Sequence, residues 1–479
     1  MPSVGVAAFE RHLDDLGRRV GACAARPETR ERISKVIAAL ACDLPTKNAW
    51  TIAEHAGEDD PHGVQHLLNR ASWDEDAARE ELAGFVADYL ADPDAVLIGD
   101  ETGDLKKGTH TVGVQRQYTG TAGRTDAQVA VYLAYATRRG HALIDREVYL
   151  PASWTEDRGR CERAGVPADV GFATKPTLLG DMVERALAGG LPASWVTADE
   201  AYGGDPKLAR RLEDLSDQRV ANGEQGVGYV LAISTTRKVP ITATTSRPAS
   251  RVAADLPKRS WQRRSAGPGA HGQREYEWAQ VELHPRITER PNSAPRTGGK
   301  DGRPTHSRAW AAMLDRTQAR TRERGHRWWL LVRRNLKTGQ MAFYLAFAAR
   351  PVSLAALVAV AGRRWAIEES FQASKGLTGL DEHQVRRWTS WRRWTLLVMA
   401  AHAVLAIATL TARDRDREVA IREGLIPLTC AEVRRLVAAA ARRVVEATFV
   451  EAWSYWRRRH QDRARTSHYA ARHQIPPSK

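Results

Sequence analysis

The chain has 479 residues and a formal net charge of +15, from 72 Lys and Arg against 57 Asp and Glu. This length is enough for two to four domains with their own cores. Its four cysteines lack metal-ligand spacing, which argues against a zinc site or a disulfide framework and fits a reducing compartment.

The N-terminal segment and the apolar runs bear on location. The first residues contain no basic stretch followed by an apolar one, so we expect no signal peptide. The longest apolar run, residues 396–410, is 15 residues long and too short to span a bilayer. We therefore expect a soluble cytoplasmic protein with no membrane partner.

The positive charge is concentrated in one internal segment. Residues 1–90 contain 10 basic and 16 acidic side chains, whereas residues 237–340 contain 23 basic and 8 acidic ones, a net of +15. Such a block favours a surface for a polyanion, nucleic acid first, over one that only aids solubility. Aromatic rings that could stack on bases lie among these arginines: Trp261, Tyr276, Trp278 and Trp310.

Residues 1–92 are predicted to form an N-terminal helical domain. Apolar residues recur at helical spacing in 9–20, 30–41 and 76–91. Two shorter helices, 50–54 and 63–68, could form a helix-turn-helix that reads DNA. The acidic balance of this region favours a domain that only packs.

Residues 93–234 alternate between predicted strands and helices. A buried strand at 96–100 ends in Asp100 before a turn at Thr102 and Gly103, and a short strand at 195–198 delivers Asp199. Further strands are predicted at 109–118, 128–137, 141–150 and 228–234, and helices at 177–188 and 205–217. This order predicts an α/β fold with one mixed sheet.

Residues 235–345 are predicted to form a basic insertion domain rich in β-structure. The segment 291–304 has the composition of an exposed loop. Strands at 328–334 and 340–346 are predicted to form a hairpin around residues 337–339.

The segment 353–375 is predicted to be a helix. On it, Arg364, Glu368 and Lys375 would share one face, because they are spaced by four and seven residues. The alternative is a solvated ladder of ion pairs. A second apolar helix is predicted to run to residue 410, followed by a basic C-terminal region.

Three separated acids suggest one chemistry. Asp100 and Asp199 each follow a predicted strand, and the carboxyl ends of neighbouring strands lie about 5 Å apart. With Glu368 they would form an all-oxygen set suited to Mg²⁺, and two such ions can promote in-line phosphodiester displacement. Glu101, Glu200 and Glu369 are one residue away from these acids and should point elsewhere.

These residues also carry a resemblance. The spacing of Arg364, Glu368 and Lys375 resembles the Arg-Glu-Lys part of the Tyr-x2-Arg-x3-Glu-x6-Lys signature of DDE transposases in the group of insertion sequence four. The strings DETG at 100–103, KKG at 106–108, QYTG at 117–120 and ADEAYG at 198–203, with Trp154 and Val166-Pro167, resemble the subgroup of insertion sequence seven-oh-one. The resemblance covers roughly residues 52–402.

The resemblance implies a ribonuclease H-like catalytic core. Its first part would be residues 93–234 and its second part 346–411, interrupted by the insertion 235–345, with residues 1–92 and a basic helical region 412–479 outside it. Asp100, Asp199 and Glu368 would be the catalytic metal ligands for two Mg²⁺ ions, for which Mn²⁺ could substitute. The position of the signature tyrosine holds Ala361, which puts that phosphate contact, and with it a hairpin intermediate, in doubt.

The resemblance also implies which residues meet DNA. Arg364 and Lys375 would contact it near the cut, and the insertion would grip transposon ends. Trp261 could hold a flipped base, although an ordinary buried tryptophan is the simpler interpretation. The remaining candidates are Lys106, Lys107, Lys258, Arg259, Arg263 and Arg264.

The leading hypothesis is a nucleoid-associated DNA transposase. It would cleave at terminal inverted repeats, transfer the freed strands into target DNA by cut-and-paste transposition, and act as a homodimer on double-stranded DNA. Two alternatives remain: a catalytically inactive or repurposed DNA-binding protein, and a ribonuclease H-like nuclease without strand transfer.

Overall fold

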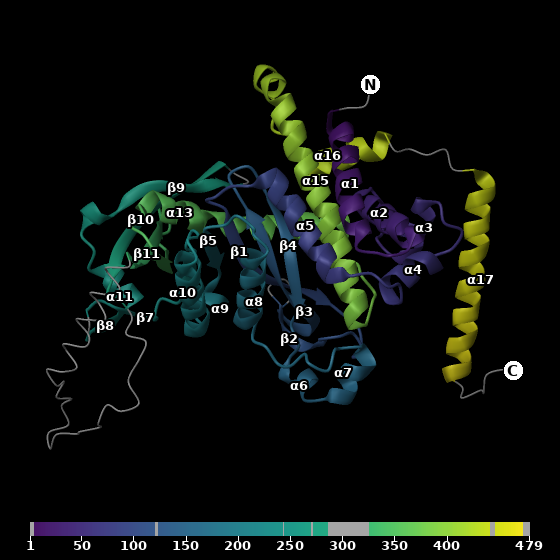
Figure 1. Cartoon of the computed structure of the whole chain (residues 1–479), viewed down its shortest axis with the longest axis horizontal. Coiled ribbons are helices and arrows are strands. Elements are labelled where there is room, and N and C mark those ends of the chain that lie inside the picture. Colours follow the sequence, from purple (N-terminus) through teal and green to yellow (C-terminus); the bar gives the residue numbers. More distant parts are fainter. Residues whose placement is uncertain are drawn as a thin grey trace.

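The computed structural model describes residues 4–119, 123–242, 244–269, 272–285, 325–440 and 446–472. The loop predicted at 291–304, and Trp310, lie outside these residues. A central mixed sheet is flanked by helices on both faces, and a further group of helices lies to one side of it (Figure 1). The predicted α/β class with a mixed sheet is confirmed.

Within the described residues, one sheet holds ten strands in the order β2-β3-β1-β5-β6-β12-β11-β10-β9, with β4 also paired to β3. β5 lies parallel to β1 and to β6, and the other pairs are antiparallel. The strands are β1 (Val96–Leu105), β2 (Gln115–Thr119), β3 (Gly123–Ala136), β4 (His141–Val148), β5 (Trp195–Ala198), β6 (Gly228–Ile233), β9 (Gln262–Gly269), β10 (Gly272–Leu283), β11 (Arg327–Asn335) and β12 (Met341–Ala348).

Alternation along β1 assigns its side chains to two faces. Gly99 packs against Leu179 of α8 (Lys175–Ala188), whereas Asp100 faces α14 (Trp365–Ala373). Helices α13 (Leu354–Arg363) and α14 therefore cover one face, and α8 and α10 (Pro206–Ala221) cover the other. Figure 1 labels α13, α8 and α10. The apolar start of β1, 96–98, is fully buried, and each such side chain contributes roughly 1.5–3 kcal/mol.

Three local predictions were wrong in detail. Of the strand predicted at 109–118, only the last residues lie in a strand, because β2 begins at Gln115. The strand at Asp100 does not end there, because β1 continues to Leu105 in antiparallel pairing with β3, so Thr102 and Gly103 are strand residues. The single helix predicted at 353–375 is interrupted at Arg364 and ends in a π-turn, Ser374–Thr378, that contains Lys375.

The basic insertion is continuous with the sheet. Its predicted hairpin is confirmed as β11 and β12, and β12 pairs with β6. β9 and β10 then extend the sheet outward, and a small ribbon, β7 (Lys238–Pro240) and β8 (Ser246–Pro248), lies beside α11 (Ala249–Ala254) and a 3₁₀ turn, Lys258–Ser260.

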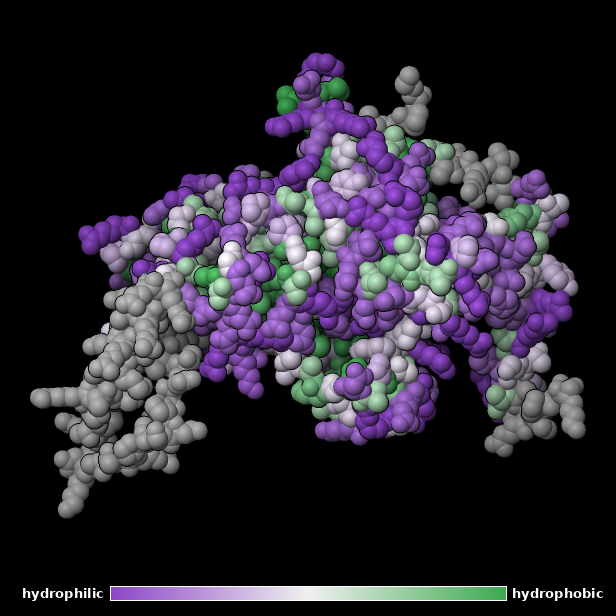
Figure 2. Space-filling model, viewed as in Figure 1, coloured by the Kyte–Doolittle hydropathy of each residue, from purple (hydrophilic) through white to green (hydrophobic). Residues whose placement is uncertain are grey.

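The predicted N-terminal helices are confirmed. They pack around α15 (Trp388–Glu423), whose apolar window is long enough to cross a membrane but is 83% buried within the protein, as in a core helix. Exposed apolar side chains near the end of α15 include Val419 and Ile421. Hydrophobic atoms are visible among hydrophilic ones where this helix protrudes (Figure 2). The helices of this region are α1 (Val4–Ala22), α2 (Pro27–Ala41), α3 (Ala49–Ala56), α4 (His62–Asn69), α5 (Glu75–Leu90) and α16 (Cys430–Ala440).

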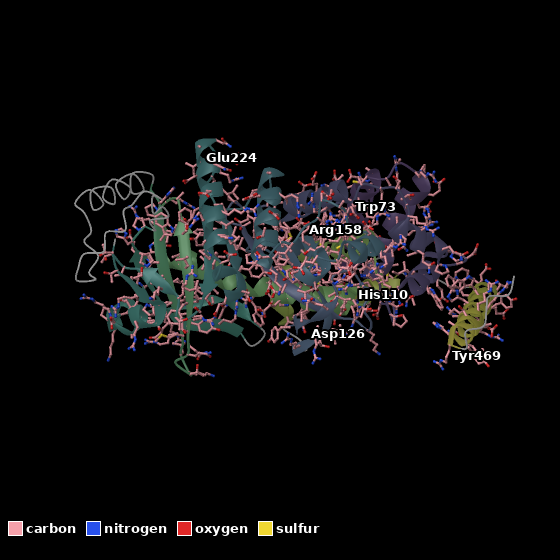
Figure 3. The ribbon with its side chains drawn as sticks, turned by 90° about the horizontal axis from the view of Figure 1, so that it is seen from below. Trp73, His110, Asp126, Arg158, Glu224 and Tyr469 are labelled. Carbon is pink, nitrogen blue, oxygen red and sulfur yellow. The ribbon has the colours of Figure 1, made fainter. Side chains whose placement is uncertain are left out.

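The C-terminal helix α17 (Ala447–Arg472) docks on α3 and the turn after it. Trp453 is fully buried and donates from Nε1 to the carbonyl of Glu58 at 2.9 Å, and Trp456 packs edge-on against Trp50. The far end of α17, marked by Tyr469, extends away from the body (Figure 3). Two short connecting helices, α6 (Ala152–Thr155) and α7 (Arg158–Ala164), follow β4.

Candidate active site

Asp100 and Asp199 lie side by side on adjacent parallel strands. Gly99 of β1 is in register with Ala198 of β5, and each of these residues is followed by an aspartate. Neighbouring strands are about 5 Å apart, which brings the two carboxylates to one point of the sheet. Asp199 also caps the short helix α9 (Glu200–Gly203), because its Oδ1 accepts from the amide of Ala201 at 2.9 Å.

Burial and a neighbouring negative charge make both aspartates harder to ionise. Burial, and next the negative charge of Asp199, raise the pKa of Asp100 to about 7, against the opposing effect of Arg364. Burial, and next the charge of Glu101, also raise the pKa of Asp199. A cation placed between these carboxylates would relieve their repulsion.

Arg364 connects the third acid to this pair. It stands at the junction of α13 and α14, where its Nη2 donates to Glu368 Oε1 at 2.5 Å and its Nη1 lies 3.5 Å from Asp100 Oδ2. Burial opposes the charge of Arg364, but the carboxylates of Glu368 and Asp100 outweigh it and raise the pKa of the guanidinium. The arginine thus neutralises part of the acidic cluster.

The donors suit a hard divalent cation. No group of three or more His, Cys, Asp or Glu side chains within metal-binding distance occurs in the described ranges. Asp100 and Asp199 are nevertheless neighbouring carboxylates under mutual repulsion, and Glu368 is one ion pair away through Arg364. An all-carboxylate set of this kind fits Mg²⁺ or Mn²⁺.

The neighbouring acids point elsewhere, as the alternation of side chains predicts. Glu101 accepts from Lys175 Nζ at 2.7 Å and from the hydroxyl of Tyr202 at 2.6 Å, on the α8 side of the sheet. Glu369 pairs with His141 Nε2 at 3.2 Å. Glu200 is exposed on α9.

The predicted stripe of Arg364, Glu368 and Lys375 is divided. Lys375 Nζ lies 3.4 Å from the carbonyl oxygen of Gly103 and 3.6 Å from Asp104 Oδ1, on the far part of β1. Lys106 contacts His383, which in turn contacts Asp104, whereas Lys107 is exposed.

The insertion residues lie on its outer strands and turns. The ring of Trp261 is half-buried beneath the guanidinium of Arg334, 4.0 Å from the ring centroid. Arg263 pairs with Glu275 at 2.5 Å, and Arg264 donates to the side chain of Gln262. Lys258 and Arg259 are exposed on the 3₁₀ turn. These contacts favour the structural interpretation of Trp261.

Some residues near the site were not anticipated. Arg274 of β10 donates to the carbonyl of Gly362, and therefore ties the insertion to the helix pair that carries Glu368. Tyr344 of β12 is buried, and its hydroxyl lies within the electrostatic influence of Arg333 and Arg364. Asp104 follows Asp100 on the same face of β1, a position that period-two alternation could have indicated had the strand been drawn longer.

The family match and the similar protein described next agree with each other. The family described as "DDE superfamily endonuclease" matches residues 19–286, which include Asp100 and Asp199 but not Glu368. The "Probable transposase for insertion sequence element IS701" of Microchaete diplosiphon is 29% identical over 200 residues, which are 42% of this chain and 47% of that protein. The match therefore spans about half the length of this relative.

A solved structure aligns over more of the chain but more loosely. The cryo-EM structure of the piggyBac transposase synaptic complex with hairpin DNA aligns with 94% of this chain and 84% of its own, at 10% identity and a TM-score of 0.38.

Proposed function

Because the chain belongs to the DDE superfamily of endonucleases, we propose that it is a DNA transposase that cuts at the terminal inverted repeats of its element and joins the freed ends to target DNA. The observation that supports this most directly is the register of β1 and β5, which sets Asp100 beside Asp199. Arg364 links Glu368 to that pair.

The family implies a divalent metal, and we propose Mg²⁺, with Mn²⁺ as a substitute, at Asp100, Asp199 and Glu368. When bound there, two ions would polarise the scissile phosphodiester and activate the attacking oxygen for in-line displacement. Asp199 would keep its place because it caps α9, and Asp100 because it is held within a paired strand. Arg364 would turn from the carboxylates toward a phosphate as the cations take over its role.

The insertion supports a DNA substrate. Its described acids are all paired with arginines: Asp255 with Arg247, Glu275 with Arg263, Glu277 with Arg334 and Glu282 with Arg327. The unmatched cations of the segment can therefore meet phosphates. Since two ends must be held at once, we propose that two copies act together on DNA, in the cytoplasm where the chromosome lies.

A plasmid integration assay with Mg²⁺ tests the proposal. Joined products indicate a transposase, cut products alone a nuclease, and binding alone a repurposed DNA-binding protein. The decisive variant is Glu368→Gln, which keeps the side-chain shape but loses the charge, and its matched control is Glu369→Gln. We expect Glu368→Gln to bind ends without cleaving them and Glu369→Gln to cleave. Undiminished cleavage by Glu368→Gln would refute the assignment of this acid.

A further inference from the structure

A second group of charged side chains lies farther along the catalytic strand. Asp104 is four residues beyond Asp100 on β1, so its side chain emerges on the same face, ~13 Å away at the usual rise of a strand. It is buried, and two side chains contact it, one from the π-turn after α14 and one from the segment before α15. A third side chain, just after β1, contacts the second of these.

The contacts form a connected chain. His383 Nε2 lies 3.1 Å from Asp104 Oδ2, and Lys106 Nζ lies 3.4 Å from His383 Nδ1 and 3.0 Å from the His383 carbonyl. Lys375 Nζ approaches the other carboxylate oxygen, Asp104 Oδ1, at 3.6 Å. Both lysines are thus placed by one aspartate, Lys375 directly and Lys106 through the histidine.

One histidine tautomer suits both side-chain contacts. A lysine ammonium can only donate, so the tautomer with its proton on Nε2, directed at Asp104, leaves Nδ1 to accept from Lys106. Burial lowers the pKa of His383 and keeps the ring neutral. Burial would raise the pKa of Asp104, but the hydrogen bond from His383 and the nearby lysines lower it, so the carboxylate is charged.

More than one acid acts on the two lysines. Their ammonium groups face the carboxylate of Asp104 and one neutral ring, and the exposed carboxylate of Asp381 also acts on Lys106. Within the described residues, Asp104 Oδ1 is a buried oxygen without a hydrogen-bond partner, so the contact with Lys375 is loose. An anion that approached Lys375 would find an ammonium whose donors are not all used.

We propose that Asp104 and His383 are positioning residues that hold Lys106 and Lys375 as one binding pair for a backbone phosphate of DNA. This inference rests on the proposed function, because it assumes that a DNA strand runs along β1 from the carboxylates toward the lysines. Lys107, adjacent in sequence but exposed, has no place in the pair.

The test compares two substitutions that remove the same charge. Asp104→Asn removes the carboxylate that places the lysines, and Asp126→Asn removes an exposed carboxylate on β3, whose carbonyl accepts from the amide of Lys106. Simple electrostatics predicts tighter DNA binding for both. Positioning predicts the opposite for Asp104→Asn, so the two explanations differ in sign.

Binding of end DNA is measured against salt concentration, together with the rate of strand cleavage in Mg²⁺. Each lost phosphate contact makes the plot of log K against log salt shallower by about 0.9. We therefore expect the slope for Asp104→Asn to be shallower than that of the wild type by about 1–2. Cleavage should fall by about ten- to a hundredfold, as when a group that orients a functional residue is removed. Asp126→Asn should match the wild type or bind slightly more tightly.

A second set of variants covers the case in which Asp104→Asn does not fold, which circular dichroism would reveal. His383→Gln should then lose about 1 in slope, because only Lys106 is released. Adding His383→Gln to a folded Lys106→Gln variant should weaken binding no further, because the histidine acts through that lysine. Slopes equal to the wild type for Asp104→Asn or His383→Gln would overturn the inference, whereas a wild-type protein that does not cleave end DNA would overturn the proposed function instead.

Discussion

Removal of Arg364 is the sharpest test of the charge balance at the acidic site. Its guanidinium lies 2.5 Å from Glu368 and 3.5 Å from Asp100, so Arg364→Ala leaves carboxylates that repel each other across a partly buried site. A divalent ion would restore the balance. We therefore expect the loss of stability to depend on whether Mg²⁺ or a chelator is present.

The size of the stability loss caused by Arg364→Ala follows from the exposure of the ion-pair partners. Breaking a buried ion pair costs about 3–5 kcal/mol and an exposed one about 0–1 kcal/mol. The side chains of Arg364, Glu368 and Asp100 are 25%, 33% and 15% exposed. The cost of breaking their ion pairs should therefore lie between the values for a buried and an exposed pair. We expect Arg364→Ala to cost about 2 kcal/mol in chelator and less than about 1 kcal/mol in saturating Mg²⁺.

Urea unfolding followed by tryptophan fluorescence measures both values. The matched control is Arg363→Ala, because the neighbouring guanidinium donates to the carbonyl of Asp94 and faces none of the three acids. Its effect should be the same in chelator and in Mg²⁺. If Mg²⁺ stabilises Arg364→Ala no more than Arg363→Ala, Arg364 does not balance the acids and the reasoning fails.

Three further predictions concern the scaffold. A Cβ at Gly203 would lie 1.8 Å from a backbone oxygen of β6, so Gly203→Ala should displace Asp199 and abolish cleavage, whereas Gly84→Ala, in open space within α5, should stabilise by about 0.5–1 kcal/mol in thermal unfolding. Burial lowers the pKa of His12 to about 4, so the unfolded chain binds the proton more readily and stability falls as pH drops from 6.5 toward 4; His12→Gln should remove about 2 kcal/mol of the loss between pH 7.5 and 5 in urea titrations. Trp453→Ala should cost about 3–5 kcal/mol of docking energy and raise amide hydrogen exchange in α17, while exchange in Tyr455→Ala, exposed on the same helix, should stay at the wild-type level.

Periodicity and local chemistry were enough to find most elements. The strand at 195–198 and the helix starting at Pro206 match the structure, because a short apolar run before an acid and a capping Asp205 are local signals. The fold class followed from the alternation of such elements. The two aspartates were also recognisable in sequence, since each follows an apolar strand core.

Other features depend on partners distant in the chain. The end of β1 is set by its pairing with β3 as far as Ala127, which no local turn signal revealed. The break at Arg364 coincides with contacts to Asp100, 264 residues away, so local helix propensity could not predict it.

The sequence by itself therefore determined which residue types are available for chemistry and which short elements carry them, because propensity and periodicity act over a few residues. Only the tertiary structure decided which acids are neighbours, and that Lys375 turns from Glu368 toward Asp104. Strand register and ion pairing depend on segments brought together across hundreds of residues, and those distances are set by packing.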